Sequence, residues 1–370
     1  PRWHPADEEL SRTIDADPLV WYETERPNLV AATEQAAREG GHELCWDLAA
    51  SAVSLFLARG HYDEWERSLG HGLAVTRRHG NRRGMAAMLT GLGLLDAYRH
   101  RYPRATRMLQ EALDLFRRLD DRHGLALAGP VIAHVVGAQG DHAQAIAHHL
   151  ETIEVLRELG DRGAEILALR SLGQLLVEIG RPRQALPHLK RALELGDAGH
   201  RRAHVEVTFC FAEALLACGE VAAADKWFRR LFELAERNGD LRGLAAAHYG
   251  MGMIELHADR LRTAVEFFHQ ALGLYLRTGE RRMEGRVRLA LGELYRRERA
   301  FSEAIGQLTL AVTVFGEIGA VLWQARALDL LGDVHAARNG PADAALSRDA
   351  WGRARSLLAQ VSSADVDRIL

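Results

Sequence analysis

The stretch 163–199 reads GAEILALRSLGQLLVEIGRPRQALPHLKRALELGDAG, and the rest of the chain repeats its pattern. Its apolar and small residues recur at three- and four-residue spacings, which place them on one face of a helix. They are Leu169, Leu172, Gly173 and Leu176 in the first half, and Ala185, Leu189, Ala192 and Leu193 in the second. The stretch therefore predicts two amphipathic helices joined by a short turn, each with one side to bury.

Small residues mark equivalent positions along the chain. The position of Gly173 is taken in turn by Gly93, Ala133, Gly173, Ala212, Gly252, Gly292 and Gly332, in steps of 40, 40, 39, 40, 40 and 40 residues. Twelve residues after each of them comes an alanine: Ala105, Ala145, Ala185, Ala224, Ala264, Ala304 and Ala344. Because side chains at a helix crossing set how closely two backbones approach, these series are predicted to lie where paired helices cross.

A third series marks the helix ends. Thirteen residues before each first position stand Gly80, Asp120, Gly160, Gly199, Gly239, Gly279 and Gly319. A helix commonly ends on a residue with left-handed backbone conformation, which glycine adopts at the lowest cost. Three phased series across the chain therefore predict helical hairpins repeated every 40 residues.

The pattern resembles the tetratricopeptide repeat, whose signature is W-x2-L-G-x2-Y followed by A-x3-F. Each helix here is about three residues longer than in the 34-residue form of that repeat, which adds close to one turn. The resemblance implies an all-α fold, a right-handed α-α superhelical solenoid of about eight hairpins. The repeats are expected near 41–80, 81–120, 121–160, 161–199, 200–239, 240–279, 280–319 and 320–361.

Both ends of the chain lie outside the phased series. Residues 1–40 are interpreted as a helical leader that starts at Asp17–Pro18, breaks at Pro27 and links to a domain upstream of this sequence. The first repeat is degenerate, since Val53 and Trp65 occupy its two small-residue positions. Residues 362–370 are expected to form a short C-terminal cap. The beginning, which lacks a methionine, reads as cut from something longer.

Composition indicates a folded protein of the cytoplasm. The net charge of −3 over 370 residues argues against a dedicated nucleic-acid or membrane surface. No apolar run reaches the length of a membrane span, and no signal segment opens the chain. The three cysteines, Cys45, Cys210 and Cys218, form no plausible disulfide framework and are expected to be small buried side chains in a reducing compartment.

The leader carries a second resemblance. WYETERPNLVAA is similar to a stretch, written roughly W-L-x-A-E-x-x-N-L-x-A-A, that precedes the tetratricopeptide array in large bacterial regulators. The matching positions are Trp21, Glu25, Asn28, Leu29, Ala31 and Ala32, while Tyr22 stands where that family usually has leucine. Those regulators combine a DNA-binding domain, a STAND-class nucleotide-binding domain and a C-terminal repeat sensor, as in the Streptomyces antibiotic regulatory protein type and its AfsR-like members.

This second resemblance implies a function in signal transduction and transcription regulation. The array would be a non-enzymatic sensor that keeps an upstream nucleotide-binding domain of the same polypeptide inactive until a ligand fills its groove. The expected ligand is a protein or peptide, or a small-molecule effector.

Motifs for other chemistry are absent from the sequence. There is no G-x-x-x-x-G-K-[ST], G-x-S-x-G or H-E-x-x-H, so no cofactor or metal site is expected in this chain. His142, His148 and His149 could be imagined as metal ligands, but their spacing favours solvated positions on a helix face. Two groups of arginines, 99–107 and 281–288, are interspersed with acidic residues and read as solvated surface rather than as a nucleic-acid site.

The concave wall supplies the candidate site. In the tetratricopeptide family the first helix of each hairpin lines this wall. Its wall residues come from positions −6, −3, −2, +1, +4 and +5 relative to the small-residue anchor. Carried over, these positions predict a site for a ligand or partner made of Arg170, Gln174, Glu206, Phe209, Glu213, Tyr249, Met253, His257, Arg286, Glu293 and Arg326. Arg170, Tyr249, Arg286 and Arg326 are expected to contribute most to binding.

Several alternatives stay open. In the first, the groove charges simply pair with each other across adjacent helices, Glu213 with a neighbouring arginine for example. In the second, the chain is a freestanding peptide receptor or scaffold with no ATPase attached. A third possibility, an enzyme acting through a groove glutamine, finds no paired catalytic groups in the sequence.

Overall fold

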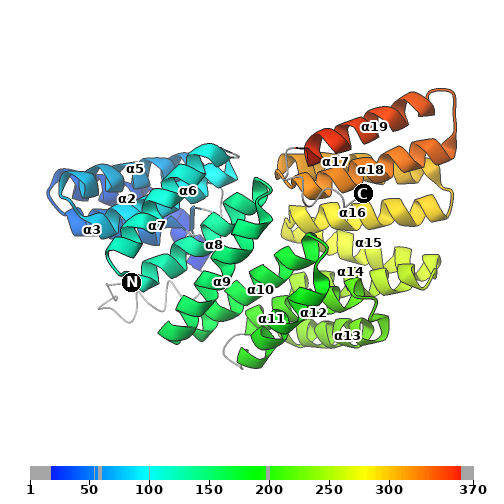
Figure 1. Cartoon of the computed structure of the whole chain (residues 1–370), viewed down its shortest axis with the longest axis horizontal. Coiled ribbons are helices and arrows are strands. Elements are labelled where there is room, and N and C mark those ends of the chain that lie inside the picture. Colours follow the sequence, from blue (N-terminus) through cyan, green and yellow to red (C-terminus); the bar gives the residue numbers. More distant parts are fainter. Residues whose placement is uncertain (1–17, 54, 57–60, 100, 197–200, 360–370) are drawn as a thin grey trace. The chain divides into compact units, whose positions relative to one another are not determined.

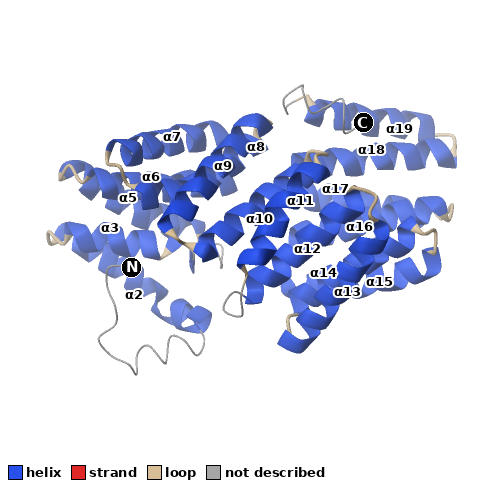
Figure 2. Cartoon of the chain, turned by 60° about the horizontal axis from the view of Figure 1, so that its bottom comes forward, coloured by secondary structure: helices blue, strands red, loops and turns tan. Residues whose placement is uncertain are grey.

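The computed structural model describes residues 18–53, 55–56, 61–99, 101–196 and 201–359. These residues form 17 helices and contain no strand, which confirms the predicted all-α class (Figures 1 and 2). The helices fall into two compact units, Pro1–Val136 and Gly137–Leu370. The residues interpreted as the C-terminal cap, 362–370, and the helix-start residue Asp17 lie outside the described residues.

The helix bounds follow the 40-residue period. The first unit holds α2 (Pro18–Arg38), α3 (His42–Ser51), α5 (Tyr62–Arg78), α6 (Arg82–Tyr98), α7 (Tyr102–Arg118) and most of α8 (Arg122–Ala138). The second holds α9 (His142–Leu159), α10 (Arg162–Glu178), α11 (Pro182–Leu195), α12 (Arg201–Ala217), α13 (Val221–Asn238), α14 (Leu241–His257), α15 (Leu261–Thr278), α16 (Arg281–Arg297), α17 (Phe301–Glu317), α18 (Val321–Arg338) and α19 (Asp343–Leu358).

The predicted helix ends are confirmed wherever the structure describes them. Gly80, Asp120, Gly160, Gly239, Gly279 and Gly319 all have positive φ, between 50° and 71°. Gly199 lies outside the described residues. At Gly160 the left-handed residue closes α9, and its backbone N–H donates to the carbonyl oxygens of Arg157 and Leu156. The left-handed turn thus satisfies carbonyl groups that the ending helix would leave unpaired.

The predicted crossing points are also buried. All seven positions in the Gly173 series are buried, and six of the seven alanines in the second series are 0% exposed. A Cβ at Gly173 would lie 2.5 Å from Cγ of Leu189, four residues beyond Ala185. Glycine is therefore required at position 173 because a leucine from the second helix packs directly on its backbone.

The seventh alanine departs from the predicted register. Ala344 is exposed, while Asp343 is buried at the start of α19. The Asp343 carboxylate accepts hydrogen bonds from Arg338 Nε at 2.9 Å and from the Gly340 backbone N–H at 2.6 Å. These contacts lower the pKa of Asp343, with the Arg338 hydrogen bond as the largest cause. The polar anchor turns α19 so that Asp343 occupies the inward position that alanine was expected to hold.

The leader helix is continuous, so the predicted break at Pro27 is wrong. Helix α2 runs through Pro27 and packs against α3 and α5. Tyr22 is fully buried, and its ring meets that of Phe56 edge-on, with centroids 6.0 Å apart. A proline inside a helix costs about 3 kcal/mol, which burial of an aromatic side chain and its neighbours can offset.

The second unit stacks its hairpins so that the first helices touch one another. Helices α10, α12, α14, α16 and α18 contact in that order, while each second helix packs on the first helix of its own hairpin. The first helices therefore form a continuous inner layer, and their faces turned away from the second helices supply the groove.

Candidate functional site

A pocket of about 1050 Å³ lies against the inner layer of the second unit. It is bounded by α10, by the middle of α12, by the first turns of α14 and α16, and by the last turns of α13 and α15. Six residues predicted from the sequence line it: Arg170, Gln174, Glu206, Phe209, Glu213 and Arg286. The structure thus brings together from three helices what the sequence places in three separate repeats.

Helical spacing explains why these side chains share one surface. Arg170 and Gln174 are four residues apart on α10, and so are Arg282 and Arg286 on α16. Residues four apart lie one above the other on the same helix face. Each inner helix therefore presents a short polar stripe to the pocket, while its small-residue anchor faces the paired helix.

Arg286 is the centre of the site and is only 6% exposed. Its guanidinium forms an ion pair with Glu213 and donates to the hydroxyl oxygen of Tyr249 at 3.3 Å. The same group lies 4.6 Å from the ring centroid of Trp323 and 5.1 Å from that of Tyr249. Cation–π contacts of this kind strengthen when water is excluded. Arg286 is thus held from several sides by α12, α14 and α18.

Burial shifts the pKa values of the groups around Arg286. Desolvation lowers the pKa of Arg286 to about 9 and raises the pKa of the neighbouring Cys210 thiol to about 11. It also raises the pKa of Tyr249. Each shift favours the neutral form of a group withdrawn from water. A pKa of about 9 still leaves Arg286 positively charged at neutral pH.

The pairing of Glu213 with Arg286 is one of the alternatives that the sequence left open. Arg170 and Glu206 form a second such pair, with Nη1 and Oε2 3.3 Å apart. Groove charges thus do pair with each other across neighbouring helices. Two donors remain, because Arg170 Nε and Arg286 Nε are buried without a hydrogen-bond partner among the described residues.

A further cluster joins α10 to α16 and α18. Glu178, in the last turn of α10, forms an ion pair with Arg282 and accepts from Trp323 Nε1 at 3.5 Å. Its backbone carbonyl accepts from Arg326 Nη2 at 2.7 Å. We call Glu178, Arg282, Trp323 and Arg326 the Glu178 bridge. It connects residues that lie more than 100 positions apart in the sequence.

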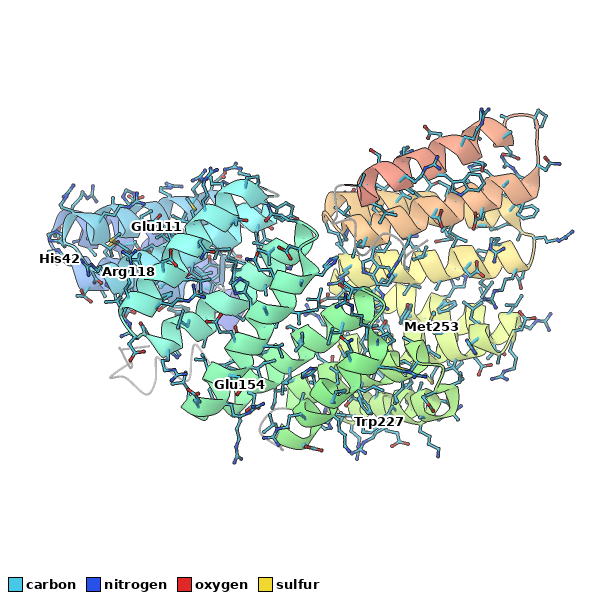
Figure 3. All side chains as sticks on the ribbon, viewed as in Figure 1. His42, Glu111, Arg118, Glu154, Trp227 and Met253 are labelled. Atoms are coloured by element: carbon cyan, nitrogen blue, oxygen red, sulfur yellow. The ribbon has the colours of Figure 1, made fainter. Side chains whose placement is uncertain are left out.

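The remaining predicted site residues lie outside the lining of the pocket. Tyr249 is buried beneath Arg286. Met253 lies on α14 (Figure 3). It is partly buried against the cluster around Phe268. His257 is exposed at the end of α14. Glu293 pairs with Arg296 at 2.7 Å and with Arg297 at 2.8 Å. These four are neighbours of the site along the inner layer rather than parts of its wall.

Two residues of the Glu178 bridge escaped the set of groove positions used on the sequence. Arg282 and Trp323 stand ten and nine residues before their glycine anchors, whereas that set begins six residues before. Extending it by one helical turn toward the N-terminus would include both, because residues three or four apart share a face.

The structure also shows how the histidines on α9 and the cysteines are buried. His142 and His149 are buried rather than solvated, since His149 follows the buried Ala145 by four residues and shares its inward face on α9. No group of three metal-ligating side chains occurs among the residues that the structure describes. Cys45 and Cys210 are free and buried, as expected, and Cys218 is half-buried.

The arginine groups are only partly solvated. Arg101, Arg104, Arg107 and Arg281 are exposed, as expected. Arg286 is buried, and Arg288, with a side chain 13% exposed, pairs with Glu284 of the same helix at 2.9 Å. In the first unit, Arg99 pairs with Asp63 at 2.6 Å and with Glu66, both on α5.

None of the helices described is long and apolar enough to cross a bilayer.

Comparisons with known proteins agree with this architecture. The family model of the tetratricopeptide repeat matches residues 131–198. The match spans less than half of the chain, and hairpins like the one it covers recur through the other described helices.

Three solved structures share this fold. The apo form of the quorum sensor NprR from B. thuringiensis covers 96% of this chain and 99% of its own, with a TM-score of 0.59 and 13% identity. A Rap protein complexed with competence and sporulation factor covers 85% and 92%, with a TM-score of 0.58 and 13% identity. A Signal Transduction ATPase with Numerous Domains (STAND) protein with a tetratricopeptide repeat sensor, from Pyrococcus horikoshii, covers 95% and 53%, with a TM-score of 0.55 and 13% identity.

At such identities the likeness concerns the fold. The array resembles the STAND protein in its helical repeats, and this chain spans about half the length of that protein.

Proposed function

We propose that this chain is a non-enzymatic binding module that holds a protein or peptide in the charged groove of its second unit. The observation that carries the proposal is the pocket on the inner layer, where arginine side chains with unpartnered Nε groups line a volume of about 1050 Å³. Pockets with a few fixed polar groups and an apolar wall orient a ligand and select it. The Rap protein, solved in complex with competence and sporulation factor, supports a ligand of this class.

The groove suits an extended ligand better than a compact one. Its wall offers the aromatic side chain of Phe209 beside the charged groups of Arg170 and Arg286, on different helices. A peptide can place an apolar side chain and a charged group at separate points along such a wall. We keep the prediction that Arg170, Tyr249, Arg286 and Arg326 contribute most, with Tyr249 supporting Arg286 from beneath.

We expect the double variant Arg170→Gln/Phe209→Ala to weaken peptide binding by about tenfold or more, which corresponds to about 1.4 kcal/mol. Pools of fluorescein-labelled hexapeptides, titrated with the purified protein, report binding through fluorescence anisotropy. Arg229→Gln is the matched control, because Arg229 lies exposed on α13 and pairs with Asp225 outside the pocket. Equal affinity of the double variant and the wild type would place the ligand elsewhere.

We further propose that the module is the sensor of a bacterial STAND-type transcriptional regulator. The shared fold of the Pyrococcus horikoshii protein and the stretch WYETERPNLVAA on α2 support this reading. A ligand that binds one arrangement of the array more tightly would shift the equilibrium of an attached ATPase. The native gene upstream of Pro1 would then encode a Walker A motif, whereas an initiating codon close to Pro1 would favour the alternative, a freestanding peptide receptor or scaffold.

A further inference from the structure

The Glu178 bridge engages Arg282, a side chain that a ligand in the pocket would also contact. Arg282 lines the pocket, whereas Glu178, its ion-pair partner, is not among the lining residues. With its amide oxygen turned toward Arg282, Gln174 also accepts from Nη1 at 3.0 Å and from Nη2 at 3.1 Å. One arginine therefore faces the pocket on one side and an acidic side chain of its own chain on the other.

Three arginines lie close together on this wall, and each has one carboxylate partner from its own chain. Desolvation, followed by the charge of Arg170, lowers the pKa of Arg282. Arg170 and Arg286 both act on the buried Cys210 thiol, which lines the same pocket. Three guanidinium groups from α10 and α16 thus converge on one wall. Like charges brought together in a poorly hydrated site favour the binding of an anion.

Two of these guanidinium groups also keep one N–H donor without an acceptor. Arg170 Nε and Arg286 Nε are buried without a hydrogen-bond partner among the described residues, and both side chains line the pocket. An unsatisfied buried donor costs about 1–3 kcal/mol. A carboxylate presents two oxygens that accept from guanidinium groups in a planar geometry, so it meets this need directly.

We propose that a carboxylate of the ligand binds among Arg170, Arg282 and Arg286, displaces Glu178 from Arg282, and thereby releases α10 from α16 and α18. This inference rests on the peptide-binding function proposed above and adds the chemistry of the ligand and its effect on the array. The carboxylate is an aspartate or glutamate side chain, or the free C-terminus of the peptide.

The release of α10 follows from the small number of contacts that hold it there. Glu178 reaches Arg282 and Trp323 through its carboxylate and Arg326 through its backbone carbonyl. When Arg282 turns to a ligand, the Glu178 carboxylate loses its ion-pair partner and the bridge weakens. In the ligand-free protein Glu178 competes for the site, so the observed affinity includes the cost of displacing it.

Two variants test the competition by Glu178 and the role of Arg282 separately. Glu178→Gln keeps the shape of the side chain but removes the competing charge, so acidic peptides are expected to bind about tenfold more tightly. Arg282→Gln removes the shared cation, so the preference for acidic peptides is expected to fall by about tenfold. Arg229→Gln, outside the pocket, serves as the control and should change neither value.

The probes are four pools of fluorescein-labelled hexapeptides, free of acidic residues except as stated. One pool is amidated with aspartate at position 3, the second is amidated with asparagine there, and the third is amidated with lysine there. The fourth has asparagine at position 3 and a free C-terminal carboxylate. Stronger binding of the first pool identifies a side-chain carboxylate, and stronger binding of the fourth identifies the C-terminus.

Hydrogen exchange measures whether α10 is released from α16 and α18. Backbone amides in the last turn of α10 and the first turn of α18 should exchange faster in Glu178→Gln, and also in the wild type with an acidic pool bound. Unchanged exchange in both cases would overturn the release of α10. Circular dichroism of every variant confirms that it is folded before binding is compared.

The outcomes distinguish failure of the carboxylate site from failure of the peptide-binding groove. If the asparagine or lysine pool binds as tightly as the two acidic pools, the carboxylate site is wrong while the peptide-binding groove stands. If no pool binds the wild type or Glu178→Gln, the proposed function fails together with the inference. If acidic pools are preferred but Glu178→Gln binds them no more tightly, Glu178 is not a competitor.

Discussion

Replacing Glu213 with glutamine is expected to lower the free energy of unfolding by about 3–5 kcal/mol, because it leaves a buried charge without its partner. The charge belongs to Arg286, which is 6% exposed and forms its ion pair with Glu213. Tyr249 and the ring of Trp323 remain as partners, but neither carries the compensating negative charge. Urea unfolding followed by circular dichroism measures the loss.

The control for this prediction is an exposed pair. Arg353 and Asp349 lie 3.5 Å apart with side chains 57% and 65% exposed, so Asp349→Asn should change stability by less than about 1 kcal/mol. Replacing both buried partners, as Glu213→Leu with Arg286→Met, should recover most of the stability lost in Glu213→Gln. A glutamine variant as stable as the wild type would show that Arg286 is not held by Glu213 in solution.

The second large effect is expected for Phe268→Ala, which should lower the free energy of unfolding by about 3–5 kcal/mol. Phe268 is fully buried on α15, with its ring centroid 6.2 Å from that of Tyr249. Removing the ring leaves a cavity next to Tyr249, and the surrounding helices can close it only in part. Chemical denaturation measures the change, and its midpoint should fall with little change in slope.

Phe267 and Gly252 supply the controls for Phe268→Ala. Phe267 is the preceding residue, and Gly252 faces the Phe268 ring. Phe267→Ala should cost clearly less, because Phe267 is half-buried. Gly252→Ala should destabilise the wild type, since its Cβ would lie 2.6 Å from Phe268 Cε1, yet it should restore part of the stability of Phe268→Ala by filling the space. Additive effects of the two substitutions would contradict this packing.

The sequence predicted the parts of the fold that depend on neighbours along the chain. Each hairpin is specified by its own helix period, and the turn at Gly160 requires a left-handed residue that glycine adopts easily. In arrays of this kind each repeat mainly contacts the next one, so local patterns carry most of the information. The resemblance to the tetratricopeptide repeat predicted Arg170 and Arg286 on the inner wall, and both line the pocket.

The errors occurred where packing outweighed a local preference. Pro27 lies inside a continuous helix because α2 buries Tyr22 against its neighbours. Ala344 is exposed because the buried Asp343, anchored by Arg338, sets the position of α19. His149 is buried because its face of α9 turns inward. In each case the deciding contact comes from another element, which periodicity along one helix does not report.

Local sequence patterns were enough to predict the hairpin, its 40-residue period, the left-handed turns and many of the side chains on the inner helices. Which of these side chains meet depends on the packing of helices that are distant in the sequence. Glu178 contacts Arg282, Trp323 and Arg326 because small rotations between successive hairpins add up until α10 and α18 come within reach of each other. That accumulated rotation depends on the packing at every intervening crossing, and no single repeat encodes it.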